Sequence, residues 1–377
     1  MDWMVGVSQL DSSQRSAIDA VVGSGESHHW IKGFSGTGKT IVLTHIIKRL
    51  AADRSRSLCF ATYTHALKEM VESGLSKDER SRLTTTTFPG LARTSGRFDV
   101  IVADEFQDIR KEHFEVLKQR ARSIVFAADF AQRIYNWGMP ADALQRAVKP
   151  SVSHQLRTIH RINRPVYEFA TTIYEDARFA PGRLPTDDRE PVHLFRAPSK
   201  IGEVRTIVEE AARVARPRKP SAILLPSNPA IKNFLETLSS IYGWGEVPPS
   251  GRDIYGIAQA DPFRKRNDYL RLHGSPIQQF GSTSGSITAS DTRKTVYLMT
   301  YHNAKGLEFP FVFLPTLSAQ TGLGATELHR RMFFVAATRA KERLYLSYHG
   351  RPHTFITEAE ALGPSTIKKM STSGSRY

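Results

Sequence analysis

The sequence predicts an α/β protein in which strands alternate with helices to form parallel sheets. A glycine-rich loop at 33–40 lies between a short β-prone run at 30–32 and a segment at 41–50 whose apolar residues recur three and four apart, as on the buried side of a helix. Apolar runs and helical patterns then alternate through both halves of the chain. We therefore expect two such domains, 1–153 and 154–362, with a short irregular insert at 243–295 and a disordered tail at 363–377.

The loop at 33–40 reads G-F-S-G-T-G-K-T and fits the pattern G-x-x-x-x-G-K-T of a phosphate-binding loop. Its glycines let backbone N–H groups close around an anion, and the next helix directs its positive end at the same phosphates. Lys39 is expected to reach the β- and γ-phosphates, and Thr40 to hold Mg²⁺. The loop residues expected to bind the nucleotide are Gly33, Ser35, Gly36, Thr37, Gly38, Lys39 and Thr40.

A pair of carboxylates follows the apolar run at 98–103. Because carboxylates at the carboxyl end of a buried parallel strand are well placed for nucleotide chemistry, we expect Asp104 to hold Mg²⁺ and Glu105 to orient the attacking water. The alternative is an acidic loop at a strand end without a catalytic role.

The run at 123–129 predicts another strand, which is followed by Gln132, Tyr135 and Trp137. Gln132 could sense the γ-phosphate, and the two aromatic rings could offer flat faces on which unpaired bases stack. The alternative for both rings is burial in the core or at a domain seam. Near the N-terminus, Gln14 follows a helix-start signal, and its amide could pair with an adenine edge.

The 377 residues carry a formal net charge of +15, which favours an anionic partner such as nucleic acid over an uncharged one. The alternative is a set of solvated basic faces, and the same two readings apply to a possible basic helix at 263–272. The single cysteine, Cys59, lies in an apolar run and is expected to be a buried thiol, so internal disulfides are excluded. No stretch has the length of a membrane span, and the N-terminus lacks a signal-peptide pattern, so we expect a cytoplasmic protein.

Four spaced motifs resemble those of superfamily 1 helicases, and among them the UvrD/Rep/PcrA-like branch. They are the phosphate loop, D-E-x-Q-D at 104–108, T-x-H-x-A-K-G-L-E-F at 300–309 and V-x-x-T-R-A at 335–340. The resemblance implies two RecA-like P-loop domains, with ATP and Mg²⁺ in the cleft between them. It also implies movement on single-stranded DNA, 3′→5′ in direction, with RNA as an open alternative partner.

The resemblance also assigns roles by position. Gln14 and His160 resemble adenine contacts, Gly306 and Glu308 lie in a motif near the nucleotide, and Gln132 resembles the residue that couples the γ-phosphate to nucleic acid. Arg161 and Arg339 resemble two arginine fingers supplied by the second domain. The residues in motifs that line the single-strand path are Tyr63, His65, Thr87, Phe88, Tyr135, Trp137, Thr300 and His302.

The chain departs from the family pattern in ways that bear on function. Ile41 stands where an arginine is common, and His160 where a tyrosine is usual. Thr87 follows Tyr63 by only 24 positions, so the auxiliary subdomains of larger relatives are expected to be missing. Two hypotheses follow. One is an ATP-dependent DNA helicase or translocase; the other is a nucleic-acid-stimulated sensor or regulatory ATPase of a repair or phage-defence assembly, with a nuclease as a possible partner.

Overall fold

The computed structural model describes residues 3–24, 27–135, 137–149, 151–175, 190–250, 261–281, 292–320 and 323–370. Within these ranges the chain divides into two compact units, one ending at Arg161 and the other beginning at Ile162. Each unit has its own sheet, and all the strand pairs in both sheets are parallel. The sequence prediction of two parallel α/β domains is therefore confirmed.

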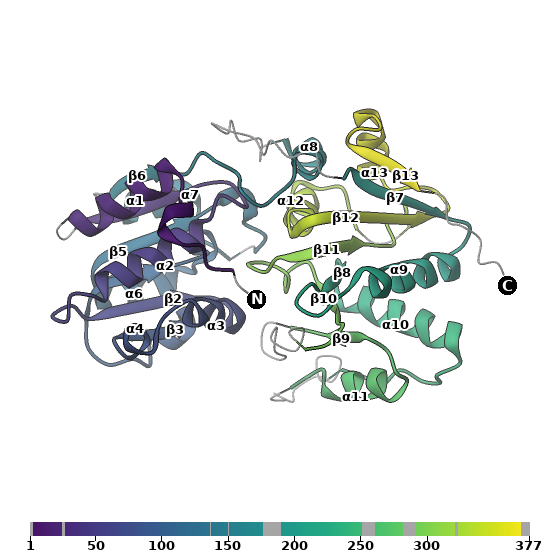
Figure 1. Ribbon diagram of the computed structural model, residues 1–377, viewed down its shortest axis with the longest axis horizontal. Helices are drawn as coiled ribbons and strands as arrows, with labels where there is room; N and C mark the ends of the chain where they lie inside the picture. The colour runs from purple at the N-terminus through teal and green to yellow at the C-terminus, as the bar shows by residue number, and fades with distance from the viewer. Residues whose placement is uncertain are drawn as a thin grey trace. The chain divides into compact units, whose positions relative to one another are not determined.

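The first unit has a six-stranded sheet in the order β3-β2-β4-β5-β1-β6 (Figure 1). Its elements in chain order are η1 (Val7–Gln9), α1 (Ser12–Gly23), β1 (His28–Lys32), α2 (Lys39–Leu50), β2 (Leu58–Thr62), α3 (His65–Ser73), α4 (Lys77–Ser81), β3 (Leu83–Thr87), α5 (Phe88–Leu91), β4 (Phe98–Ala103), η2 (Phe106–Asp108), α6 (Lys111–Arg120), β5 (Ala121–Ala128), η3 (Phe130–Gln132), α7 (Ala141–Ala147) and β6 (Ser151–Gln155).

Successive residues of the central strands point to two separate hydrophobic layers. In β4, Val100 and Val102 belong to the layer formed with α1 and α2, whereas Ile101 and Ala103 belong to the layer formed with α5, α6 and α7. Because helices cover both faces, the central strands have continuous apolar sequences instead of alternating ones. Cys59 of β2 lies inside this core, where burial raises the pKa of its thiol to about 12, as its apolar surroundings predicted.

The second unit has a seven-stranded sheet in the order β13-β7-β12-β11-β8-β10-β9. Its elements in chain order are α8 (Arg164–Ile173), β7 (Val192–Ala197), α9 (Lys200–Val214), β8 (Ser221–Leu225), α10 (Asn228–Tyr242), α11 (Arg264–Leu272), β9 (Ile277–Gln279), β10 (Val296–Thr300), β11 (Phe309–Leu314), α12 (Glu327–Ala337), β12 (Ala340–His349), α13 (Thr354–Ala359), η6 (Glu360–Leu362) and β13 (Ile367–Met370).

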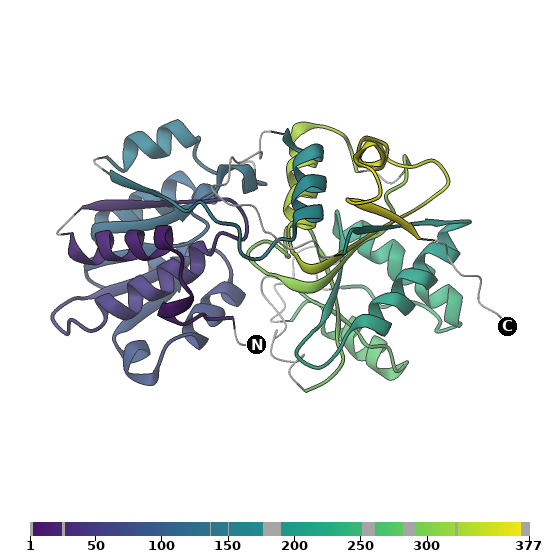
Figure 2. The ribbon, with the colours of Figure 1, turned by 45° about the horizontal axis from the view of Figure 1, so that its top comes forward.

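Helices also cover both faces of this second sheet. Helices α9, α10 and α11 share one hydrophobic cluster with the strands, to which α10 contributes Phe234 and α11 contributes Leu270. Helices α8 and α12 pack side by side (Figure 2). Between them Phe169 lies edge-on to Phe333, with ring centroids 5.9 Å apart. None of the helices in the described ranges has the length and apolar character needed to cross a membrane.

Three expectations about domain organisation are corrected by the pairing of short strands. The first unit extends to Arg161 and not to residue 153, because β6 pairs with β1 and His160 N–H donates to the Gly36 carbonyl oxygen at 2.9 Å. The insert at 243–295 contains α11, which confirms the helix expected at 263–272, but it is not otherwise irregular, because the strand β9 joins the sheet. The tail at 363–377 begins with an ordered segment, since β13 pairs with β7; residues 371–377 lie outside the described ranges.

Candidate functional site

The phosphate loop leaves the carboxyl end of β1 and leads directly into α2. Gly36 and Gly38 have φ values of 79° and 82°, a left-handed conformation that side chains other than glycine rarely adopt. A Cβ atom on Gly33 would lie 2.3 Å from Thr37 Oγ1, and one on Gly38 would lie 2.6 Å from Gln14 Nε2. The backbone therefore forms the close cradle that the sequence pattern predicts for an anion at a helix N-terminus.

Side chains on both sides hold this loop in shape. Lys39 Nζ donates to the carbonyl oxygens of Gly33 and Phe34, at 2.9 and 3.1 Å, so its ammonium group lies against the loop. Gln14 donates from Nε2 to the Thr37 carbonyl oxygen at 3.0 Å and accepts from the Asp11 backbone N–H at 3.0 Å. The amide of Gln14 is thus engaged within the protein, and its contact with adenine remains a prediction.

His160 lies beside Gln14 on the same side of the loop. Its Nε2 is 2.7 Å from Asp11 Oδ2, and Asp11 also caps α1 by accepting from Gln14 N–H at 2.9 Å. Although burial works in the opposite direction, hydrogen bonds from Ser13, Gln14 and His160 keep the pKa of Asp11 below its ordinary value. The structure therefore brings Gln14 and His160 together next to the loop, as the motif positions predicted, with Asp11 as an unpredicted link between them.

Asp104 follows β4 and meets the start of α2. The Thr40 hydroxyl donates to Asp104 Oδ2 at 2.6 Å, while the Glu105 backbone N–H donates to Asp104 Oδ1 at 2.8 Å. Burial, followed by the nearby charge of Glu105, raises the pKa of Asp104 to about 6. Mg²⁺ prefers oxygen ligands, and the Thr40 hydroxyl and the Asp104 carboxylate bring such oxygens together. A cation here would offset the energetic cost of the buried Asp104 charge. The residues therefore fit a magnesium ion.

Glu105 is held in an uncommon backbone conformation, with φ 54° and ψ 36°. Gln107 Nε2 donates to Glu105 Oε2 at 2.5 Å, and Gln107 Oε1 accepts from the Asp129 backbone N–H at 3.1 Å. The amide of Gln107 thereby ties the carboxylate that we expect to act as the base to the end of β5. Backbone strain at a non-glycine residue persists when its surroundings fix it, as this hydrogen bond does.

Asp129 connects the predicted γ-phosphate sensor to the loop lysine. Its Oδ2 accepts from Gln132 Nε2 at 2.6 Å and lies 3.7 Å from Lys39 Nζ. Neither Gln107 nor Asp129 received a role from the sequence. The signal that could have found Asp129 is the one that found Asp104, a carboxylate at the carboxyl end of a buried strand.

The aromatic residues expected along the nucleic-acid path fall into two groups. Phe88 is only 1% exposed and packs against Tyr63 and Phe106, so its ring belongs to the core and offers no face to a base. The expectation that Phe88 contacts nucleic acid is corrected by this burial. Tyr63 is also fixed, since its hydroxyl donates to the Asp108 carbonyl oxygen at 2.7 Å and burial raises its pKa.

Tyr135 and Trp137 form the second group. Their rings are stacked with centroids 4.4 Å apart, and Trp137 is 46% exposed. The Arg110 guanidinium lies 4.5 Å from the centre of the Trp137 ring. Of the remaining residues, His65 is exposed at the start of α3, and Thr87 caps α5 by accepting from Gly90 N–H at 3.2 Å.

The second unit places its motif residues at the carboxyl end of β10 and beyond. Thr300 ends that strand, and its Oγ1 accepts from Asn303 N–H at 3.2 Å. His302 and Glu308 are half-buried in the segment that follows, where Gly306 has a φ of 77°. This segment leads directly into β11, so the motif at 300–309 connects the two strands that flank β8 in the sheet.

The two predicted arginine fingers lie in different units. Arg161 ends the first unit, which corrects the expectation that the second domain supplies both. Arg339 lies in the second unit and is 3% exposed; its guanidinium donates to the carbonyl oxygens of Val335 and Leu307, at 2.8 and 3.3 Å. Their roles toward ATP remain predictions.

The fold and the phosphate loop together define the class of protein. A G-x-x-x-x-G-K-T loop between a parallel strand and a helix, with a strand-end carboxylate on the loop threonine, is the arrangement of a P-loop nucleotide-binding protein, and two such parallel α/β units fit a RecA-like pair. Residues 9–182 match the model of an AAA domain.

The second unit and the curated relatives give more specific likenesses. Residues 279–351 match the UvrD-like helicase C-terminal domain. The ATP-dependent DNA helicase PcrA of Staphylococcus aureus (strain MRSA252) is 35% identical over 116 residues, and DNA helicase II of Haemophilus influenzae is 40% identical over 95 residues. Over these segments the chain is therefore similar to UvrD-like and PcrA-like DNA helicases.

These matches are partial. They cover 25% and 23% of this chain, and 15% and 13% of the two relatives. Among solved structures, the Arterivirus nonstructural protein 10 (helicase) in complex with DNA has a TM-score of 0.43 and 13% identity, and the alignment covers 92% of this chain and 65% of that one. That structural likeness is too distant to carry an argument.

Proposed function

We propose that this chain is an ATP-dependent DNA helicase or translocase that moves on single-stranded DNA, 3′→5′ in direction, with Mg²⁺ as its metal ion. The observation that carries the proposal is the cluster of Lys39, Thr40, Asp104 and Glu105 around one loop. The PcrA and DNA helicase II relatives support the choice of DNA as the track.

Each member of the cluster has a task that follows from its chemistry. The loop N–H groups and Lys39 would bind the phosphates, and Thr40 with Asp104 would hold the cation. Bound Mg²⁺ would neutralise charge on the transferring phosphoryl group. Glu105, whose carboxylate is positioned by the hydrogen bond from Gln107, would orient the attacking water and take its proton. Gln132 and Asp129 would respond to the state of the phosphates, because Asp129 lies beside Lys39 and Gln132 donates to Asp129.

The experiment compares the parent with Lys39→Ala and Glu105→Gln in an ATPase assay with and without single-stranded DNA. We expect DNA to stimulate hydrolysis in the parent, and both variants to lose it. Glu105→Gln should still bind ATP, because it keeps the loop and only replaces the base. Rapid hydrolysis by Glu105→Gln would refute the assignment of the base. Single-stranded RNA in place of DNA tests the choice of nucleic acid.

The second candidate is a sensor or regulatory ATPase of a larger repair or defence assembly, with a nuclease partner. It is favoured by the short connections in both sheets: α3 and α4 alone link β2 to β3, and 16 positions separate Gln279 from Val296. These connections have no room for a large auxiliary subdomain. A strand-displacement assay separates the candidates, since unwinding supports the helicase and DNA-stimulated hydrolysis without unwinding supports the sensor or a translocase.

A further inference from the structure

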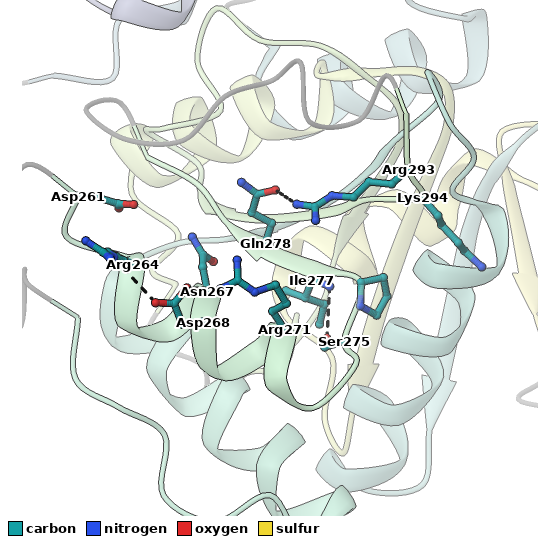
Figure 3. Close-up of a pocket in the computed structure, with 11 residues that line it drawn as sticks. Asp261, Arg264, Asn267, Asp268, Arg271, Ser275, Ile277, Gln278, Arg293 and Lys294 are labelled. Carbon is teal, nitrogen blue, oxygen red and sulfur yellow. Dashed lines mark hydrogen bonds and ion pairs between the residues drawn. The ribbon is translucent and has the colours of Figure 1, made fainter.

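A pocket of about 300 Å³ lies in the second unit, between α11 and the amino ends of β9 and β10 (Figure 3). Four basic side chains line it: Arg264 and Arg271 from α11, and Arg293 and Lys294 from the segment that enters β10. The spacing of Arg264, Asp268 and Arg271 on α11 places them on one face of the helix. The sequence singled out this helix as basic but left its role open.

Positive charge exceeds negative charge in this pocket. Among the described residues that line it, the acidic ones are Asp261 and Asp268, against four basic side chains. Asp268 is shared, because Arg271 approaches it at 2.9 Å and Arg264 at 3.9 Å. Arg293 donates instead to the amide oxygen Oε1 of Gln278 at 3.2 Å, a neutral partner that does not offset its charge. The pocket is thus suited to an anion.

The pocket lies away from the motif residues of the same unit. Arg293 and Lys294 come just before β10, whereas Thr300 ends that strand. At about 3.3 Å per residue, roughly 20 Å separates Lys294 from Thr300 along the strand. An oligonucleotide short enough to occupy only the residues near Thr300 would not reach the pocket.

We propose that this pocket is a second nucleic-acid contact, which binds a backbone phosphodiester outside the path of the motor motifs. The guanidinium groups of Arg264 and Arg271 have side-chain exposures of 80% and 74%, so an extended polyanion can reach them without rearranging the fold. The polar side chains of Asn267 and Gln278 supply neutral hydrogen-bonding groups beside the charges. The chain's net charge of +15 would attract the same partner from a distance.

The test is a double variant, Arg293→Gln with Lys294→Gln. Both side chains are exposed, so the fold should not change. The matched control is Lys368→Gln with Lys369→Gln, which removes the same charge from β13 at the opposite edge of the same sheet. Affinity is measured without ATP for a DNA duplex with a single-stranded tail, over a range of salt concentrations, and inorganic phosphate is titrated as a separate ligand.

We expect the pocket variant to bind the tailed duplex about tenfold more weakly, and the slope of log affinity against log salt to become shallower by about 2. The control should match the parent. Unchanged affinity in the pocket variant, or equal weakening in the control, would overturn the proposal, as would affinity for inorganic phosphate alone. Hydrolysis stimulated by a short oligonucleotide should be unaffected, and its loss would place the pocket on the motor path instead. If the unmodified protein binds DNA but does not hydrolyse ATP, the proposed ATP-driven function is wrong. The comparison of DNA affinity between the pocket variant and the control variant still tests the pocket in that case.

Discussion

The Thr40 hydroxyl donates a 2.6 Å hydrogen bond to Asp104, although the two residues are 64 positions apart in the chain. Thr40 lies in the first turn of α2, and Asp104 directly follows β4. The parallel sheet produces this contact, because strands β1 and β4 flank β5 and present their carboxyl ends at one edge. The loop predicted to bind phosphate and the carboxylate predicted to hold the metal ion thereby meet at one point.

Replacing Thr40 with valine tests that contact. Valine has nearly the same shape but no hydroxyl, so Asp104 would keep its buried carboxylate and lose one donor. We expect ATP hydrolysis at saturating Mg²⁺ to fall at least about tenfold, the effect of losing one interaction worth about 1.4 kcal/mol. Thr40→Ser keeps the hydroxyl and should retain most of the activity. Equal rates for the valine and serine variants would show that the hydroxyl has no part in the reaction.

Gln107→Leu tests whether Gln107 positions the base. The substitution removes the hydrogen bonds to Glu105 and to the Asp129 backbone, which weakens the restraint on the position of the Glu105 carboxylate. Because small misplacements of a catalytic group are costly, we expect kcat to fall about tenfold to a hundredfold while KM for ATP changes little. Steady-state kinetics separates the two constants. A rise in KM with kcat preserved would assign Gln107 to nucleotide binding instead.

The sequence was sufficient for the features that depend on strong local patterns. Both parallel sheets, the loop at 33–40 and the strand-end position of Asp104 follow from apolar runs, helical spacing and glycine placement. Two edge strands gave no such signal. In β6 all residues but Val152 are polar and none is buried, and in β13 only Ile367 is buried, so neither strand contains an apolar run. Pairing with a neighbour far away in the sequence makes them strands.

Residue type alone could not decide which aromatic residues face solvent. Phe88 and Trp137 were equally suited to stacking on a base, and burial separates them, at 1% and 46% exposure. The sequence also could not predict the contact between Gln107 and Glu105. The direction of the Gln107 side chain depends on the backbone conformation of Glu105, which the sequence does not specify. The placement of Arg161 depended on a backbone hydrogen bond from its neighbour, His160, to Gly36, which no pattern encodes.

Stability should depend on pH through His29, which is buried in β1. Its Nδ1 lies 3.0 Å from His154 Nε2, and burial together with the nearby His154 lowers the pKa of His29 to about 4, from an ordinary 6.5. Between these pH values the unfolded chain binds the proton and the folded chain does not, so stability is present above pH 6.5 and is lost as pH falls toward 4. We expect a loss on the order of 1–2 kcal/mol.

Urea unfolding at pH 7.5 and pH 5 measures this loss. His29→Gln should show a smaller decrease in unfolding free energy between the two pH values than the parent, because glutamine does not titrate. The exposed His65, changed to glutamine, serves as the control and should leave the decrease unchanged. Comparing each variant with the parent also cancels the contribution of other groups, such as Asp104. An identical decrease in His29→Gln and the parent would rule His29 out as the source.

Ile367→Ala tests whether the C-terminal segment is a strand or a loose tail. Ile367 is 6% exposed and pairs with Val192 of β7, so alanine would remove buried methyl groups and leave a cavity. We expect the unfolding free energy of the second unit to fall by about 2 kcal/mol. Lys368→Ala, one position on and exposed, should change it by less than about 0.5 kcal/mol. The two substitutions alter the same short segment, so a larger loss for Ile367→Ala reports the burial of the Ile367 side chain. If both substitutions change the unfolding free energy negligibly, residues 363–370 belong to the disordered tail that their composition predicts.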